Sequence, residues 1–272
     1  MNEQQQNDIE VITSNQLARA DEVLPGVIHL LPVAARPFFP GQAVPLLLHA
    51  EAWTPTIDAI AKSPHDLLGI VLTTNDKSEL ATPDEMYDIG TVGRIHRAQM
   101  VDGKLQVLIE CLQRFRIEQF HSDKAPFTAS VSYIKEFSGR PGDDIKAYAM
   151  AIINTIKELL PLNPLYAEEL RMFLDRFGPD DPSHLADFAA SLTTADKEVL
   201  QDVLETVELL PRMEKVLNVI NNELQLVKSQ QTIRKRVEER MEKQQREFFL
   251  KEQLREIQKE LGLEKDDRTA EL

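Results

Sequence analysis

The chain has 272 residues, 42% of them hydrophobic and 28% charged, which is the composition of a globular protein and not of a disordered chain. Its length suggests about two domains. The single cysteine, Cys111, excludes an internal disulfide framework. No apolar run is long enough to span a membrane, and the polar start "MNEQQQNDIE" lacks the apolar region of a signal peptide, so we expect a cytoplasmic protein.

The net charge of −14 is unevenly distributed along the chain. Residues 1–211 hold 17 basic and 32 acidic residues, whereas residues 212–261 hold 12 basic and 9 acidic residues. An acidic body repels phosphate, so nucleic acid is not an expected partner. The charges of the basic segment alternate in sign, which is typical of a solvated helix.

Residues 1–24 are expected to form a flexible leader, and residues 25–137 have the pattern of a β domain. Short apolar runs such as "VIHLLPV" and "AVPLLLHA" are separated by Pro, Gly or polar residues. The run "KLQVLIEC" alternates, and Asp102-Gly103 before it predicts a two-residue hairpin turn. About seven strands in this length indicate a small barrel or sandwich, with a short helix at Trp53–Ser63.

A Gly/Pro linker, "SGRPGDD", precedes a helical pattern over residues 143–210, which we interpret as a bundle of four helices. The segments "LYAEELRMFLDRFG" and "SHLADFAASL" are its second and third helices. Thr193 and Asp196 form a capping-box pattern that predicts the start of the fourth. The apolar face expected for this helix consists of Val199, Leu200, Val203, Leu204, Val207 and Leu210.

Residues 212–261 contain no Pro or Gly and predict one helix of about 75 Å, with Pro211 placed to break the chain or to occupy the first turn. The helix begins with an apolar stripe and is polar in its middle, so we interpret it as a spacer or arm. The stripe can pack on the bundle or on another subunit, and the sequence leaves both open. Its residues are Met213, Val216, Leu217, Ile220, Leu224 and Val227.

The end of this helix, "QREFFLKEQLREIQKELG", carries a second stripe, made by Leu250, Leu254, Ile257 and Leu261. Phe248 and Phe249 lie off that stripe. Residues 262–272 offer little to cover either group, and we expect them to be a truncated tail. The cover is therefore expected on another chain or on sequence beyond this one.

Motifs for catalysis or cofactor binding are missing from the sequence. It contains no phosphate-binding loop, no G-x-G-x-x-G and no G-x-S-x-G pattern. The six histidines are widely separated, so no metal site is expected, and Cys111 is expected to be a core residue. We therefore predict no catalytic residue, no cofactor and no enzymatic activity for this chain.

Four blocks occur in an order that resembles the N-terminal region of the ATP-dependent Lon protease family. They are "LLPVAARPFFPGQAVPLLL", "EMYDIGTVGRI", "VLIECLQRFRI" and "QQREFFLKEQLREIQKELG", and the resemblance spans about residues 27–265. The last block is the most specific. Departures are Cys111 at a usual glycine, Gly93 at a usual alanine, and "PVAARPFFPG" in the first block.

The resemblance implies an α+β fold: a small PUA-like β-barrel domain, an α-helical bundle and one very long C-terminal helix. It implies a non-catalytic region that engages unfolded or damaged proteins and supports a homo-hexamer. ATP and Mg²⁺ would belong to an AAA+ module, and a Ser-Lys dyad to a protease domain, neither of which is in this chain. The alternative is a stand-alone adaptor or binding protein without an ATPase.

Substrate proteins are expected to meet exposed apolar side chains. The candidates stand beside Pro, Gly or polar breaks, and ordinary core or turn packing is the alternative for each. They are Phe38, Phe39, Trp53 and Met100.

Overall fold

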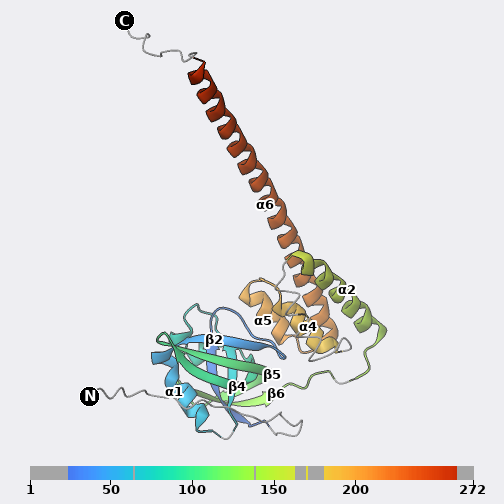
Figure 1. The fold of residues 1–272 in the computed structure, drawn as a ribbon. Coiled ribbons are helices and arrows are strands. Elements are labelled where there is room, and N and C mark those ends of the chain that lie inside the picture. The colour runs from blue at the N-terminus through green and yellow to red at the C-terminus, as the bar shows by residue number, and fades with distance from the viewer. Residues whose placement is uncertain (1–23, 64, 138, 163–169, 171–180, 262–272) are drawn as a thin grey trace, which may run out of the picture. The chain divides into compact units, whose positions relative to one another are not determined.

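The computed structural model describes residues 24–63, 65–137, 139–162, 170 and 181–261 (Figure 1). The chain divides into two compact units, Met1–Glu223 and Leu224–Leu272. The first unit contains a β-sheet followed by helices. Helix α6, Leu209–Glu260, begins in the first unit and forms the described part of the second.

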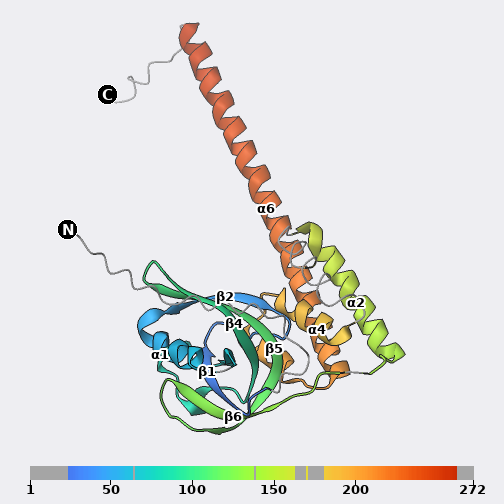
Figure 2. The same ribbon diagram turned by 60° about the horizontal axis from the view of Figure 1, so that its bottom comes forward.

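Six strands form one mixed sheet in the order β2-β5-β4-β3-β1-β6. β5 also pairs with β6, so the pairings run in a circuit from β1 through β3, β4, β5 and β6 back to β1. Figure 2 shows the sheet coiled around its own interior. The β-rich N-terminal part is thus confirmed, with six strands among the described residues instead of about seven. The strands are β1 Val27–Val33, β2 Ala43–His49, β3 Leu67–Leu72, β4 Ile89–Val101, β5 Lys104–Phe120 and β6 Phe127–Tyr133.

The predicted hairpin joins β4 to β5. Asp102 and Gly103 have φ values of 49° and 75°, and Val101 pairs with Lys104 across the turn. Positive φ at both positions matches the type I′ turn that the Asp-Gly pair predicts. The alternation in β5 is also confirmed, because every second residue from Leu105 through Val107 and Ile109 to Cys111 is buried.

One apolar cluster fills the interior of the sheet, and helix α1, Ala50–Ala61, packs against it through Trp53, Ile57 and Ile60. Because successive side chains of a strand face opposite sides, β6 and the first half of β5 contribute alternate residues to this core, whereas all six residues of β3 are buried. The helix begins three residues before the predicted start at Trp53. Short 3₁₀ turns at Ser78–Leu80 and Pro83–Glu85 connect β3 to β4.

Helix α2, Asp143–Leu159, begins where the Gly/Pro linker ends and buries Ile152, Ile156 and Leu159, as its apolar pattern predicts. A 3₁₀ turn, Leu160–Leu162, follows it. The expected helix "LYAEELRMFLDRFG" lies outside the described residues, apart from Leu170, which is helical. Helix α4, Pro182–Ser191, corresponds to the expected third helix.

The predicted capping box at Thr193 and Asp196 is wrong. The Thr193 hydroxyl donates to the carbonyl of Ala190 at 2.9 Å, so it serves the end of α4. Helix α5, Lys197–Glu205, has Asp196 at its N-cap without a side-chain cap bond. Its buried face consists of Leu200, Val203 and Leu204, whereas Val199, Val207 and Leu210 are 44%, 40% and 38% exposed. The expected face was too long because α5 ends before Val207.

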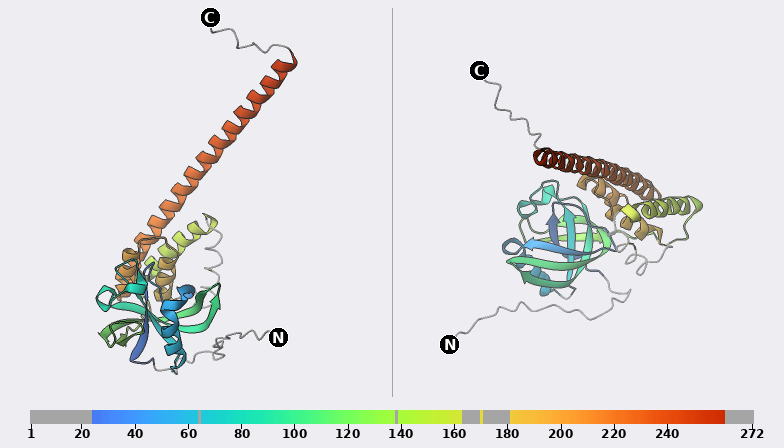
Figure 3. Two further views of the ribbon diagram at one scale, coloured as in Figure 1. Left: turned by 90° about the vertical axis from the view of Figure 1, so that its left-hand side faces the viewer. Right: turned by 45° about the horizontal axis from the view of Figure 1, so that its top comes forward.

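Helix α6 starts at Leu209, three residues earlier than expected, and runs without a break to Glu260 (Figure 3). Pro211 lies in its first turn, where the missing N–H would have no partner within the helix. The predicted long helix is therefore confirmed.

We expect Gly103→Ala to lower the free energy of unfolding by about 1 kcal/mol, because a Cβ is strained at its φ of 75° while no neighbouring atom would contact it. Gly26→Ala is the matched control, since Gly26 is also open to added atoms and has no positive φ. Urea denaturation of both variants measures the difference. Equal stabilities would show that the turn does not require a left-handed residue.

Candidate protein-binding surfaces and a buried ionic cluster

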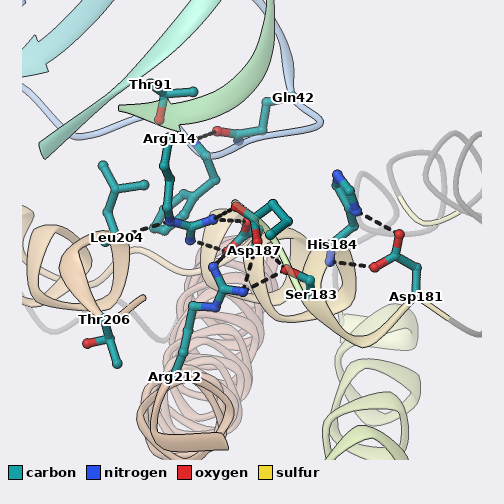
Figure 4. Close-up of polar contacts among 12 residues, drawn as sticks. Gln42, Thr91, Arg114, Asp181, Ser183, His184, Asp187, Leu204, Thr206 and Arg212 are labelled. Atoms are coloured by element: carbon teal, nitrogen blue, oxygen red, sulfur yellow. Dashed lines mark hydrogen bonds and ion pairs between the residues drawn. The ribbon is translucent and has the colours of Figure 1, made fainter. Parts of the chain in front are cut away.

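A buried ionic cluster connects the sheet to the helices of the first unit (Figure 4). Arg114 on β5 is fully buried, and its terminal nitrogens donate to both carboxylate oxygens of Asp187 on α4, at 2.7 and 2.5 Å. The same guanidinium donates from Nη1 to Glu136 Oε1 at 2.7 Å and from Nε to the carbonyl of Leu204 on α5 at 2.9 Å. One strand residue thus binds two helices.

Arg212, in the first turn of α6, completes the cluster from the other side. Its Nη2 donates to Ser183 Oγ at 2.6 Å and to Glu136 Oε2 at 3.2 Å, and its Nη1 lies 3.6 Å from Asp187 Oδ1. Ser183 in turn donates to Glu136 Oε2 at 2.5 Å. Two guanidinium groups and two carboxylates therefore balance in charge, and each carboxylate is shared by both arginines.

The pKa values show how strongly the cluster favours its charged form. Burial alone would raise the pKa of Glu136, but the positive charges of Arg114 and Arg212 lower it to about 2. Burial likewise opposes the charge of Arg114, yet the Coulombic attraction of Asp187 and Glu136 raises the pKa of this guanidinium. Both groups therefore stay ionised at neutral pH.

Three further polar contacts join helices α4 and α5 to the β domain. Gln201 on α5 donates from Nε2 to the carbonyl of Ile89 on β4 at 2.9 Å. Lys197 Nζ lies 2.8 Å from Asp76 Oδ1, and Arg36 donates from Nη2 to the carbonyl oxygen of Ser191 at 3.1 Å. The helices of the first unit are thus attached to the sheet by polar bonds as well as by packing.

The cluster was not predicted from the sequence, although one signal for it exists. Arg114 gives no signal, because its block "VLIECLQRFRI" also contains Glu110, Gln113 and Arg116, and the pattern does not mark one of these as buried. Arg212 lies near a helix N-terminus, where a cation is unfavourable unless an anion is close. The partner carboxylates could not be assigned from spacing, because they lie 22 and 73 residues from Arg114.

The four residues proposed to contact substrate do not share one surface. Phe39 is fully buried and Trp53 is 2% exposed, which fits the alternative of core packing, and Phe38 is half-buried against the core. Met100 is 44% exposed near the end of β4. In this conformation Met100 alone of the four presents a largely accessible side chain.

A different apolar group lies on the outer face of the sheet, and we call it the outer patch. It consists of Pro45 and Leu47 on β2 and Leu108 on β5, with Leu47 58% and Leu108 39% exposed. Pro45 pairs directly with Leu108, and Leu47 is one position further along the same face, so the three side chains are neighbours. Gln99 and Gln106, hydrogen bonded at 2.9 Å, and Arg97 border it.

The outer patch also reaches the edge of the sheet, because among the described residues β2 pairs with β5 alone. Pro45 has no backbone N–H and cannot donate a hydrogen bond at this edge. A further strand therefore cannot pair regularly with β2 there. A partner is therefore expected on the face of the sheet and not along its edge.

The residues proposed for helix packing fall into two groups. In the first group, Met213, Val216 and Ile220 are fully buried within the first unit and Leu217 is half-buried, so packing on the bundle accounts for them. Leu224 is 5% exposed and Val227 is half-buried. The second group is the end of α6: Phe248 71%, Phe249 62%, Leu250 53%, Leu254 58%, Ile257 55% and Leu261 67% exposed.

Comparison with known proteins identifies the family. The model of the ATP-dependent protease La (LON) substrate-binding domain matches residues 27–222, which include the whole sheet, the ionic cluster and the described bundle helices. The chain belongs to the Lon substrate-binding domain family. This match confirms the resemblance in the sequence blocks.

Full-length relatives extend beyond this Lon domain. The chain is 46% identical over 259 residues to Lon protease 2 of Hydrogenovibrio crunogenus, covering 95% of this chain and 30% of the relative. It is 40% identical over 267 residues to Lon protease of Protochlamydia amoebophila, covering 97% of this chain and 32% of the relative. The chain therefore spans about a third of the length of the relatives it matches.

Solved Lon domains share the fold. The N-terminal domain of Mycobacterium avium complex Lon protease aligns with a TM-score of 0.57 at 23% identity, covering 72% of this chain and 98% of that chain. The Lon N-terminal domain protein from Xanthomonas campestris aligns with a TM-score of 0.51 at 13% identity, covering 71% and 97%. At these identities the comparison establishes the fold alone.

Neither a metal-binding cluster nor a membrane-spanning helix is found among the described residues. They contain no group of three His, Cys, Asp or Glu side chains arranged to hold a metal ion. None of their helices combines the length and the apolar character needed to cross a membrane.

We expect Glu136→Gln to lower the free energy of unfolding by about 3 kcal/mol at neutral pH, since it removes one shared carboxylate and leaves excess buried positive charge. A folded-state pKa of about 2 is below the unfolded value of 4.5, so the ionised group stabilises the fold above pH 4.5. That contribution is lost as the pH falls toward 2. Urea denaturation between pH 7 and pH 3 should therefore show the difference from wild type shrinking with acidity.

Glu214→Gln is the control, because Glu214 is an exposed carboxylate on α6. It should change stability by less than about 0.5 kcal/mol at every pH. A Glu136→Gln effect that is small, or that is constant with pH, would contradict the assignment of Glu136 to the cluster.

Proposed function

We propose that this chain is the non-catalytic substrate-binding part of a Lon-type ATP-dependent protease, and that it engages unfolded or damaged proteins. The observation that carries the proposal is the family match over residues 27–222, which coincides with the sheet and the helices fixed to it by the ionic cluster. Relatives of about three times this length are named Lon protease, so the proteolytic activity would reside in the remainder of such a chain.

The surface we propose for substrate is the outer patch; Met100 pairs with the core residue Leu105 and therefore lies on the opposite face of the sheet. Unfolded proteins expose apolar side chains, and burying these against an accessible apolar face is favourable at roughly 25 cal/mol per Å². The outer patch is rigidly placed, because Pro45, Leu47 and Leu108 lie on paired strands over a buried core. A small patch of this kind binds weakly, which suits a site that must accept many sequences.

The second part of the proposal concerns assembly. We propose that α6 supports the association of subunits into a homo-hexamer, because its exposed apolar residues beyond Leu224 have no cover among the described residues. ATP and Mg²⁺ would bind to an AAA+ module and not to this chain, and the site of action would be the cytoplasm. The PUA-like barrel is likewise part of the proposal, supported by the circuit of strand pairings.

The proposal predicts that the full 272-residue chain binds a reduced and alkylated model protein, as measured by fluorescence anisotropy. The double variant Leu47→Ser/Leu108→Ser should weaken this binding by about fivefold or more, since it removes two accessible leucines from the outer patch. Both residues are exposed, so the fold should be retained, and circular dichroism checks this.

Met150→Ser is the matched control, because Met150 is 57% exposed on helix α2, which is not part of the sheet that carries the outer patch. It should leave the affinity within about twofold of wild type. Equal loss in both variants would show that binding does not depend on the outer patch. No binding by the wild-type chain at high micromolar concentration would contradict the proposed function itself.

A further inference from the structure

The strand register makes the outer patch the centre of a larger surface, which we call the outer face. In the first half of β5, Lys104, Gln106, Leu108 and Glu110 alternate with core residues, so their side chains share the side of the sheet that this core does not use. Each of them pairs with one residue of β2 and one of β4. The outer face therefore consists of four cross-strand rows: Ala43-Glu110-Arg94, Pro45-Leu108-Arg97, Leu47-Gln106-Gln99 and His49-Lys104-Val101.

A β-bulge in β4 places Arg97 on the outer face. The register between β4 and β5 shifts between Ile95 and Arg97, so His96 is an extra residue in β4. Ile95 and Ala98 both belong to the core, and the two side chains between them both lie on the outer face. Without the bulge, Arg97 would lie on the same side as Ile95. The bulge thus puts a cation beside Leu108 while the core keeps its apolar residues.

The outer face is cationic, although the chain as a whole has a net charge of −14. Apart from its histidines, its charged side chains are three cations and one carboxylate: Arg94, Arg97, Lys104 and Glu110. Glu110 is already engaged, because its Oε2 lies 2.6 Å from His96 Nε2. Arg97 and Lys104 are exposed, and neither side chain has an ion pair among the described residues. These two positive charges are therefore available to a partner.

We propose that the outer patch selects apolar segments that carry a carboxylate close to their apolar residues, and that Arg97 makes this selection. This deepens the proposed function and rests on it. A segment that covers Pro45, Leu47 and Leu108 brings its neighbouring residues over Arg97, which lies one strand away from Leu108, at about 5 Å. Lys104 lies about 13 Å from Leu108 along β5 and offers a second cation to a longer segment.

The local cations outweigh the net charge of the chain in this selection. The acidic body repels an acidic segment, but at about 0.15 M salt the Debye length is about 8 Å, so charges beyond the outer face are largely screened. A carboxylate paired with Arg97 is within about 4 Å and is screened least. The planar guanidinium can also donate two parallel hydrogen bonds to it. A lysine or arginine in the same place is repelled instead.

The apolar centre of the outer face favours a protein segment over a nucleic acid. Surfaces that bind single-stranded nucleic acid commonly offer aromatic side chains on which the bases stack. None of the four rows contains Phe, Tyr or Trp, and their centre is formed by Pro45, Leu47 and Leu108. The anion expected at Arg97 is therefore a side-chain carboxylate and not a phosphate.

Two fluorescently labelled peptides test the selection on the full 272-residue chain. They share one apolar centre and differ only in their flanking residues, which are aspartates in one peptide and lysines in the other. At about 0.15 M NaCl, fluorescence anisotropy should show the aspartate-flanked peptide bound about fivefold more tightly, the effect of one good exposed ion pair. At about 0.5 M NaCl the difference should fall below about twofold, because the Debye length is then about 4 Å.

Three variants assign the preference to one residue. Arg97→Glu should reverse the preference between the peptides, whereas Arg97→Lys should keep most of it, because the positive charge remains. Arg116→Glu is the matched control, with the same change in charge. Arg116 is exposed near the other end of β5, where it pairs with β4 and β6 and not with β2. This control should bind both peptides as the wild type does.

Several results would overturn the inference and leave the proposed function intact. They are equal binding of both peptides by the wild type, tighter binding of the lysine-flanked peptide, survival of the preference in Arg97→Glu, and an equal change in Arg116→Glu. A single-stranded oligonucleotide that binds more tightly than the aspartate-flanked peptide, and loses affinity in Arg97→Glu, would also overturn it. If the wild type binds neither the peptides nor the reduced and alkylated model protein, the proposed function fails as well.

Discussion

The shared carboxylates between Arg114 and Arg212 are the constraint on which the first unit depends. Taking two guanidinium groups out of water is costly, and the cost is offset only if each finds anions at hydrogen-bond distance. Asp187, Glu136 and Ser183 provide these partners, and they come from elements far apart in the chain. The sheet, α4, α5 and the first turn of α6 must therefore meet in one arrangement for any of these charges to be satisfied.

This constraint explains which apolar residues remain available for binding. The cluster holds the bundle helices and the start of α6 against the sheet. Met213, Val216 and Ile220 are therefore buried by packing and are not accessible to a partner. The outer patch on β2 and β5, with Leu108 six residues before Arg114 on β5, is not covered by these helices and stays accessible. Apart from Leu210 in its first turn, the large exposed apolar side chains of α6 lie beyond Leu224, where the second unit begins. Buried and exposed apolar residues thus occupy different parts of the same helix.

Local patterns allowed the elements of the fold to be predicted, whereas the candidate site was largely missed. The Asp102-Gly103 turn, the alternation in β5 and the long helix each follow from short-range rules and are confirmed. Phe39 and Trp53 were proposed as contacts because they stand beside breaks in the pattern, but a residue at a break can still turn into the core. Leu47 and Leu108 were overlooked, because cross-strand register decides which leucines share a face.

The ionic cluster could not be predicted for a related reason. A buried charge needs a partner, but which charge is buried and which residue becomes its partner both depend on tertiary structure. The capping box at Thr193 failed in the same way, since the hydroxyl found a carbonyl at the end of the preceding helix. Polar contacts between residues far apart in the chain therefore could not be predicted from the spacing of residues in the sequence.

A double-mutant cycle between Arg114 and Asp187 tests the central role of the cluster most directly. Arg114→Met and Asp187→Leu each leave opposite buried charge without its main partner, so each should lower the free energy of unfolding by about 3 to 5 kcal/mol. The double variant should lose much less than the sum of the two, with a coupling of at least about 2 kcal/mol. Effects that simply add would contradict the account, because the two residues would then contribute independently of each other.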